Sequence, residues 1–321
     1  MSRNTAGNRF NFNTMSEPKK VVLVTGSNGL LGQKLTDLYR TLPEVSLIAT
    51  GRGQDRYAHP SGYIYESMDI TSPSEVYDVV HKYQPDTIIH TAAMTNVDAC
   101  ELDPTDCRKL NVEAVSTLVD AANAVNAHLI HVSTDFIFDG QNGPYAEDDE
   151  PNPLSIYGQS KLDAEHLVME RARNWAIART ILVYGIVSDM SRSNIVLWAR
   201  ETLLNQKPIN VVDDQFRMPT LAEDLAMGCR LIEQKEANGV YHISGKDFMN
   251  IYELVQRVGD HFGLSTNEVT RIKSDVLNQP AKRPPVTGFD LTKSRRELGY
   301  EPHSFDEGIE LVYQQSLNRN Q

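Results

Sequence analysis

The stretch VVLVTGSNGLLGQKL, residues 21–35, decides the fold. It begins as a short β-branched run typical of a buried strand and ends with the apolar spacing of a helix. Between these parts lie Gly26, Gly29 and Gly32, which permit a tight turn and a close approach of the backbone to a ligand. The free N–H groups at a helix N-terminus attract an anion such as a pyrophosphate. The stretch therefore predicts a strand, a turn and a helix that bind a dinucleotide.

Glycines at this spacing would also allow a helix to pack closely on a strand without any ligand, so the motif alone is a weak signal. Its position directly after a predicted strand favours cofactor binding. The cofactor-binding residues expected in this turn are Gly26, Ser27, Asn28, Gly29, Leu30 and Gly32.

The chain beyond this turn continues to alternate short β-branched runs with helical patterns, which is typical of a parallel sheet with helices on both faces. Right-handed crossovers make such a sheet doubly wound, so we predict an α/β fold of the Rossmann type. The predicted strands are residues 20–25, 45–50, 63–67, 86–91, 128–133 and 175–180. The predicted crossover helices include residues 30–42, 74–83 and 112–125.

The alternation weakens after about residue 185, and a smaller C-terminal substrate-binding lobe, interleaved with the sheet domain, is expected there. Residues 239–245 are expected to return a strand to the sheet, and residues 251–263 to form a helix. The predicted NAD(P)-binding Rossmann domain covers residues 19–185 plus about 221–245. The lobe covers about 186–220 and 246–321, and the Asn-rich residues 1–18 are expected to be a disordered leader.

The composition argues against several classes of partner. The chain has 31 basic and 43 acidic residues, and its formal charge of −12 repels nucleic acids and anionic membranes. No apolar run approaches the roughly 18 residues of a membrane span. Three cysteines without paired spacing indicate a reducing cytoplasm, and nine histidines without ligand spacing indicate no metal site. We expect a small-molecule substrate, with a homodimer as a further candidate assembly.

The ends of the second and third strands bear on the choice of cofactor. NAD-specific proteins usually place an acidic residue after the second strand, whereas this chain has Arg52, which suits a 2′-phosphate. NADP(H) is therefore expected, with NAD(H) left open because Arg52 would also serve as a solvated loop residue. After the third strand, Asp69 could accept from an adenine amine while Ile70 packs on the ring. Asp69 could equally cap the helix that begins near Ser72.

Three further residues indicate acid–base chemistry. Thr134 follows the predicted strand 128–133, at the carboxyl edge where open α/β sheets bind ligands. Tyr157 and Lys161 are four residues apart, so they share one face of a predicted helix. A nearby ammonium favours phenolate, so Lys161 is expected to lower the pKa of Tyr157 from about 10. Tyr-x-x-x-Lys also occurs by chance on exposed helices.

The glycine turn, Thr134, Tyr157 and Lys161 occur in the order and rough spacing of the extended short-chain dehydrogenases, which this sequence resembles. The resemblance implies that Thr134 orients a carbonyl or hydroxyl and that Tyr157 is the acid–base group. It implies that Lys161 serves both the phenol and the nicotinamide ribose. It also implies a structural role near the lysine for Asn111, through a water relay.

Several stretches resemble more closely the dTDP-4-dehydrorhamnose reductases, which act on a nucleotide-linked 4-keto sugar. They include HTAAMTNVDACELDP, STDFIFDG, PLSIYGQSKLDAE, VVDDQFRMPT and AKRPPVTGFDLTKSRRELGY. By this resemblance Thr91, Ala92 and Ala93 line the cofactor. The substrate-binding residues that it implies are Thr95, Val97, Thr134, Asp135, Gln215, Arg217 and Arg283, with Tyr157 also facing the sugar.

The sequence departs from the reductase pattern at Phe136 in STDFIF, at Leu182 in RTILVY, and at Arg217 and Met218 in the loop QFRMPT. These departures leave the catalytic residues in place but leave the identity of the sugar nucleotide open. The expected function is NADPH-dependent reduction of a nucleotide-linked 4-keto-6-deoxysugar.

Two alternatives remain beside a reductase. An epimerase or dehydratase with tightly held NAD has the same fold, although a dehydratase would be expected to have an Asp-Glu pair after Thr134, where this chain has only Asp135. A non-catalytic NADP-binding protein is the other alternative, because the fold also resembles the regulatory subunit of methionine adenosyltransferase.

Overall fold

The computed structural model describes residues 19–58, 60–188 and 193–318, so the predicted leader lies outside the described residues. Within the described residues, seven parallel strands form one central sheet in the order β11-β6-β5-β4-β1-β2-β3. The strands are β1 (Lys20–Thr25), β2 (Val45–Gly51), β3 (Ile64–Ser67), β4 (Thr87–His90), β5 (His128–Thr134), β6 (Trp175–Thr180) and β11 (Gly239–His242). The predicted doubly wound α/β fold is confirmed, including the return of β11 to the sheet.

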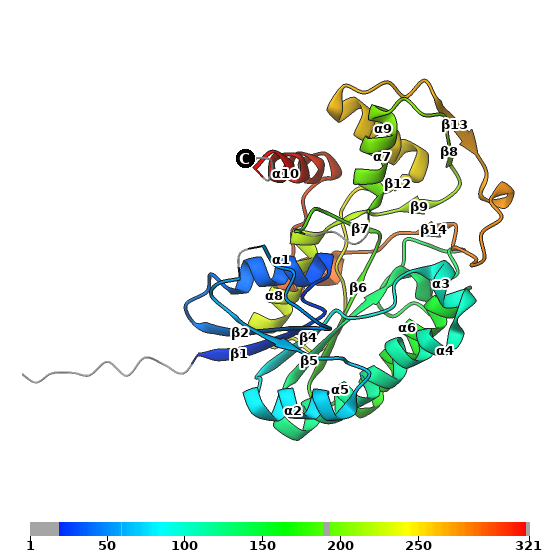
Figure 1. Cartoon of the computed structure of the whole chain (residues 1–321). Coiled ribbons are helices and arrows are strands. Elements are labelled where there is room, and N and C mark those ends of the chain that lie inside the picture. Colours follow the sequence, from blue (N-terminus) through cyan, green and yellow to red (C-terminus); the bar gives the residue numbers. More distant parts are fainter. Residues whose placement is uncertain (1–18, 59, 189–192, 319–321) are drawn as a thin grey trace, which may run out of the picture.

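Two layers of helices cover the sheet (Figure 1). One face carries α1 (Leu30–Tyr39) and α8 (Ala222–Gln234), and the other carries α2 (Pro73–Tyr83), α5 (Ala114–Val125) and α6 (Ile156–Arg171). Side chains alternate along a strand, so Val24 packs on the first layer and Leu23 on the second. Both are fully buried, which contributes about 2 kcal/mol each.

A compact helical segment connects β4 to α5 beside the carboxyl edge of the sheet. It consists of α3 (Val97–Leu102), α4 (Pro104–Arg108) and the π-helical turn η1 (Lys109–Glu113). The side chains of Asn96 and Asp103 accept backbone N–H groups at the starts of α3 and α4. A π-helical turn inside a helical segment often marks a functional site, and here it contains Asn111.

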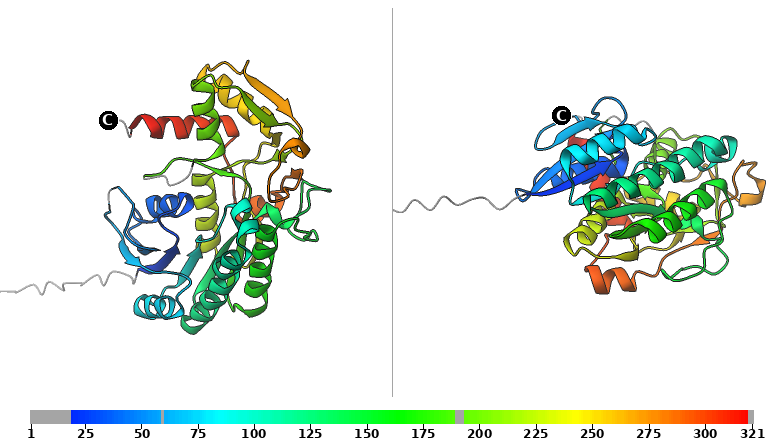
Figure 2. Two further views of the ribbon diagram at one scale, coloured as in Figure 1. Left: turned by 45° about the vertical axis from the view of Figure 1, so that its right-hand side comes forward. Right: turned by 90° about the horizontal axis from the view of Figure 1, so that it is seen from below.

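Most of the remaining elements form a lobe above the carboxyl edge of the sheet (Figures 1 and 2). Its core packs α7 (Ile195–Leu204) and α9 (Ile251–Phe262) with buried side chains from the start of α10 (Phe305–Asn318). Short strand pairs complete it: β8 (Ile209–Val212) with β13 (Val269–Ile272), and β9 (Phe216–Arg217) with β12 (Met249–Asn250) and β14 (Val286–Thr287). The other short elements are η2 (Asp135–Ile137), β7 (Val183–Tyr184), β10 (Thr220–Leu221), η3 (Ser274–Val276) and η4 (Ser294–Leu298).

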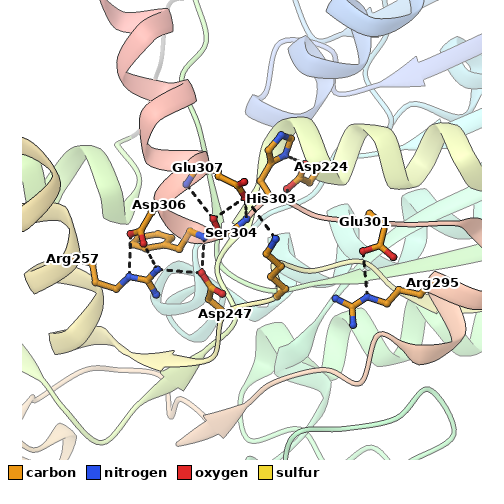
Figure 3. A network of polar contacts seen from close by, with 11 residues as sticks. Asp224, Asp247, Arg257, Arg295, Glu301, His303, Ser304, Asp306 and Glu307 are labelled. Atoms are coloured by element: carbon orange, nitrogen blue, oxygen red, sulfur yellow. Dashed lines mark hydrogen bonds and ion pairs between the residues drawn. The ribbon is translucent and has the colours of Figure 1, made fainter.

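A polar network attaches the start of α10 to the rest of the chain (Figure 3). Arg257 of α9 contacts Asp306 at 2.7 Å and Asp247 at 3.3 Å. Next to it, His303 Nδ1 lies 2.6 Å from Asp224 of α8, and the His303 backbone N–H donates to the same carboxylate. These contacts join α8, α9 and α10, so the lobe is attached to the helix layer that packs on the sheet.

Candidate active site

The glycine turn after β1 has the close backbone approach that the sequence predicts. Gly26 has φ = +70°, and a Cβ there would lie 2.9 Å from backbone atoms of Ala92. A Cβ on Gly32 would lie 2.2 Å from the Gly26 carbonyl oxygen. A larger residue at position 26 would therefore collide with the segment after β4, and one at position 32 would push α1 away from the turn.

Gly29 has a different role from its two neighbours. It is the N-cap of α1, it is exposed, and a Cβ there would meet only the Gly26 carbonyl oxygen, at 3.3 Å. Because glycine has no side chain to cap the helix, the first N–H groups of α1 remain available to an anion. Ser27 Oγ is buried and has no hydrogen-bond partner among the described residues. The turn therefore fits the pyrophosphate of a dinucleotide.

The loop after β2 is attached to the glycine turn by one side chain. The Asn28 amide nitrogen donates to Gln54 O at 3.0 Å, and its oxygen accepts from Arg56 N at 2.9 Å. This loop carries Arg52, whose side chain is exposed at the end of β2. The end of β3 lies nearby, since Gly51 pairs with Ser67. Hydrogen bonds from Thr71 lower the pKa of Asp69, and the Arg52 charge lowers it further.

Asp69 forms a local turn and does not cap α2. Its carboxylate accepts from the backbone N–H and the hydroxyl of Thr71, at 2.9 and 2.8 Å. The N-cap of α2 is Ser72. The capping alternative for Asp69 is therefore wrong, because its side chain is turned back toward its own loop. Ile70 is buried beside it in the core under α2.

Thr91 and Ala92, two of the three predicted cofactor-lining residues after β4, lie directly against the glycine turn. The Thr91 hydroxyl donates to Thr25 O at 2.6 Å, and Ala92 approaches Gly26. Asn111 lies farther along the same edge, where its amide oxygen accepts from Met94 N and its nitrogen donates to Ser160 Oγ at 3.0 Å. Asn111 therefore connects the segment after β4 to α6.

Thr134 and Tyr157 meet at the carboxyl end of β5. The Thr134 hydroxyl accepts from Phe136 N at 3.2 Å and caps η2. Tyr157 lies in the first turn of α6, with its phenol beside the Thr134 hydroxyl, which lowers the pKa of the phenol. A Cβ at Gly158 would lie 2.2 Å from Phe136 O, so this glycine allows α6 to approach η2 closely enough for that contact.

The pKa of Tyr157 is raised, whereas the sequence predicted that it would be lowered. The Tyr157 side chain is only 8% exposed, and burial raises the pKa of its phenol, while the hydrogen bond from Thr134 lowers it to a smaller extent. The Lys161 ammonium nitrogen instead contacts Val132 O at 2.8 Å and His131 Nε2 at 3.0 Å. Tyr157 is therefore protonated at neutral pH, which suits a proton donor.

Lys161 is itself perturbed by its environment. Its side chain is 3% exposed, and burial lowers its pKa to about 8, while the Glu165 carboxylate opposes this shift. A buried ammonium is costly unless acceptors surround it. Lys161 therefore remains largely protonated at neutral pH and changes charge in the mildly alkaline range.

Asp135 joins the end of β5 to the lobe. Its carboxylate accepts from the Thr134 hydroxyl at 3.2 Å and from the Thr287 hydroxyl, and Arg217 Nε lies 3.8 Å away. Burial raises the pKa of Asp135, and the Arg217 charge partly offsets this. Arg217 also donates to the carbonyl oxygens of Phe216, Pro284 and Pro285. Its guanidinium thus positions lobe backbone as well as Asp135.

The other expected substrate residues are more widely spread. Arg283 forms an ion pair with Asp98 at 2.7 Å, which attaches the 281–283 loop to α3. Val97 packs against the cluster of Cys100, Cys107 and Tyr157, and Thr95 is exposed just before α3. Gln215 is buried in the lobe, where its carbonyl oxygen accepts from Ile251 N. The structure therefore groups Thr134, Asp135 and Tyr157 but places Gln215 in the lobe interior.

Two features of this edge were not anticipated. Leu182, which follows β6, has φ = +42°, a left-handed conformation that is uncommon without glycine and often marks functional sites. Cys100 and Cys107 are both buried in one cluster with Tyr157, with Cys107 Sγ 3.4 Å from Ser160 Oγ. Cys100 and Cys107 lie on two different short helices, so their spacing in the sequence could not predict that they share a cluster.

The described part of the chain contains no group of three or more His, Cys, Asp or Glu side chains that could hold a metal ion. No helix in that part is long and apolar enough to cross a membrane.

Comparison with known proteins yields related sequences and structures. A family model described as the RmlD substrate binding domain matches residues 20–318. Methionine adenosyltransferase 2 subunit beta of Pongo abelii is 34% identical over 86% of this chain and 82% of its own length. A dTDP-4-dehydrorhamnose reductase of Aggregatibacter actinomycetemcomitans is 30% identical over 91% of this chain and 97% of its own length. The structure of a Bacillus anthracis dTDP-4-dehydrorhamnose reductase in complex with NADP has a TM-score of 0.79 and 27% identity, covering 92% of this chain and 99% of that one.

Proposed function

The chain belongs to the family whose model is described as the RmlD substrate binding domain, and from this premise we propose that it is an NADPH-dependent reductase of a nucleotide-linked 4-keto-6-deoxysugar. The observation that carries the proposal is the position of the Tyr157 phenol beside Thr134 at the carboxyl edge of the sheet, with Lys161 one helical turn further along α6. A related dTDP-4-dehydrorhamnose reductase in complex with NADP supports the choice of substrate class and cofactor.

The residues that would hold the cofactor lie at the carboxyl ends of β1, β2 and β4. The N-terminus of α1 behind Gly29 would bind the pyrophosphate, and Arg52 would bind the 2′-phosphate with its guanidinium. Thr91, Ala92 and Ala93 would line the path toward the nicotinamide. When bound, NADPH supplies a hydride to the C4 carbonyl carbon.

The protein's own residues would supply the proton. Tyr157 is protonated at neutral pH and donates to the carbonyl oxygen as negative charge develops there. Thr134 lies beside the phenol and would donate to the same oxygen by exchanging its hydrogen bond to Asp135 for that contact. Lys161, one helical turn away on α6, stabilises the phenolate that forms. The raised pKa of Tyr157 makes this positive charge necessary after proton transfer.

The substrate would lie between the sheet edge and the lobe. Arg283 is a candidate for the diphosphate, because a guanidinium matches phosphate oxygens, and it would exchange its ion pair with Asp98 for that contact. Val97 would contact the sugar from α3, beside the phenol.

The test is NADPH oxidation by the full chain with a panel of nucleotide-linked 4-keto-6-deoxysugars. Tyr157→Phe should lower kcat by about 10²–10⁴-fold while NADPH still binds, because only the proton donor is lost. Tyr241→Phe is the matched control, since it removes a hydroxyl at the edge strand β11 and should keep the wild-type rate. Undiminished turnover in Tyr157→Phe would refute the assignment of the acid.

A second candidate function is that of a non-catalytic, NADP-binding regulatory subunit. It is favoured by the 34% identity to a methionine adenosyltransferase 2 subunit beta. This candidate predicts NADPH binding without oxidation by any sugar in the panel, together with co-elution with a methionine adenosyltransferase catalytic chain in gel filtration. Turnover with one sugar, and no co-elution, would exclude it.

A further inference from the structure

A row of polar side chains crosses the central sheet just below the candidate site. Thr25, His90 and His131 are paired in register on the adjacent strands β1, β4 and β5. Thr25 Oγ1 lies 2.7 Å from His90 Nδ1, and the rings of His90 and His131 stack with centroids 5.3 Å apart. All three side chains are buried, so the row is a polar line through an apolar core.

This row ends on the lysine of the candidate site. Lys161 Nζ lies 3.0 Å from His131 Nε2 and 2.8 Å from Val132 O. A lysine ammonium has three N–H donors. Two of them are therefore directed to β5, and one remains for a ligand or for the phenol.

Packing does not explain a histidine at position 131. The side chain is completely buried, and its Nδ1 atom has no hydrogen-bond partner among the described residues. The neighbouring positions on the same face of the sheet, Ile88 and Leu129, are apolar and equally buried. A buried nitrogen without a partner destabilises the fold, so an apolar residue would pack there at lower cost. The contact that distinguishes His131 from such a residue is the one with Lys161.

The hydrogen bonds indicate the protonation of the row. An ammonium can only donate, so His131 Nε2 accepts and its ring proton lies on Nδ1. Thr25 Oγ1 already accepts from the N–H groups of Thr91 and Ala92, so its hydroxyl donates to His90 Nδ1. Burial, followed by the Lys161 charge, lowers the pKa of both imidazoles, that of His90 to about 3, and keeps them neutral.

We propose that His131 is a positioning residue for Lys161: its Nε2 lone pair and the Val132 carbonyl hold the ammonium charged at the carboxyl edge of the sheet. The catalytic meaning of this contact rests on the proposed reductase function. The other titratable groups that interact with the Lys161 charge are Glu165 on its own helix, Cys107 on α4 and His90 on β4. Among these sheet histidines, His131 is the one that contacts the ammonium nitrogen. His131 is thus the contact from the sheet that a substitution can remove.

The proposal is tested by an NMR titration of Lys161 in the full chain, produced with lysine labelled at the ε carbon. The Lys161 resonance is identified as the one missing from Lys161→Met. In the wild type its midpoint is expected at about pH 8. His131→Asn should lower the midpoint by about one pH unit, because its shorter amide cannot reach the position of Nε2. His131→Gln should restore the wild-type midpoint, because its amide oxygen reaches that position.

The Asn and Gln variants are matched, since both are neutral amides smaller than imidazole. His131→Leu, which fills the space with apolar atoms, is the second acceptor-free variant if His131→Asn does not fold, and the same fall is expected. Equal midpoints in the wild type and the acceptor-free variant would overturn the proposal, and so would a fall in His131→Gln as large as in His131→Asn. NADPH oxidation is measured on the same samples: absent turnover contradicts the reductase function, whereas the titration alone decides the role of His131.

Discussion

The Thr287 hydroxyl donates a hydrogen bond to the Asp135 carboxylate, joining residues 152 positions apart in the chain. Asp135 follows β5 of the central sheet and Thr287 lies in β14 of the lobe. The same carboxylate accepts from Thr134, which contacts the phenol of Tyr157. A single buried acid therefore connects the position of the lobe to the orientation of the candidate catalytic hydroxyls.

Asp135→Ala should lower the free energy of unfolding more than Thr287→Val does, which removes only the hydroxyl that donates to Asp135. The substitution leaves the buried Arg217 charge without its carboxylate, and breaking a buried pair costs about 3 kcal/mol of unfolding free energy. Thr287→Val removes one hydroxyl and should cost about 1 kcal/mol. Urea unfolding of both variants measures the difference, and equal losses would show that the charge of Arg217 is satisfied by backbone carbonyls alone.

The stability of the protein should rise with pH in the mildly alkaline range. The pKa of Lys161 is about 8 in the folded chain, below its usual value of 10.5, so between these values the unfolded chain binds a proton that the folded chain does not. The free energy of unfolding then increases with pH, by about 3 kcal/mol over the whole interval. Denaturant unfolding from about pH 7 to about pH 10 should show this rise. Lys161→Met should abolish it, whereas a variant of the exposed Lys235 should retain it.

Two glycine substitutions should separate folding from cofactor binding. Gly32→Ala places a Cβ 2.2 Å from a backbone oxygen and should destabilise the chain by about 3 kcal/mol. Gly29→Ala meets the same oxygen only at 3.3 Å and should cost less than about 1 kcal/mol. The added methyl group of Gly29→Ala would lie over the N-terminus of α1, however, and should weaken NADPH binding about tenfold. Thermal unfolding and fluorescence titration are the measurements, and unaltered affinity in Gly29→Ala would place the pyrophosphate elsewhere.

Arg52→Gln should reduce the preference for NADPH over NADH by about tenfold, because a neutral amide loses the charge-assisted bonds to a 2′-phosphate. Arg56→Gln is the matched control, since both arginines are exposed in the loop after β2. The measurement is the dissociation constant of each cofactor for the wild type and both variants. The ratio of the NADH constant to the NADPH constant gives the preference for NADPH. An equal change in the two variants would mean that the loop attracts the phosphate only by its general positive charge.

Much of the fold could be predicted because its signals are local. The runs 45–50 and 128–133 each extend by one residue in the structure, to Val45–Gly51 and His128–Thr134. The β-branched runs and the helical periodicity specify these elements wherever they pack. The lobe strands β9, β12 and β14 are two residues long, so no periodicity could reveal them. Their pairing depends on segments that approach one another only after folding.

The sequence by itself determined the doubly wound sheet, the glycine turn and the four-residue spacing of Tyr157 and Lys161, since each depends on neighbours in the chain. The tertiary structure decided which groups these residues meet. It turned the Lys161 ammonium toward Val132 and His131 and buried the Tyr157 phenol, reversing the expected shift of its pKa. The reason is strand register: Thr25, His90 and His131 form one row only because three separate strands align in a single way.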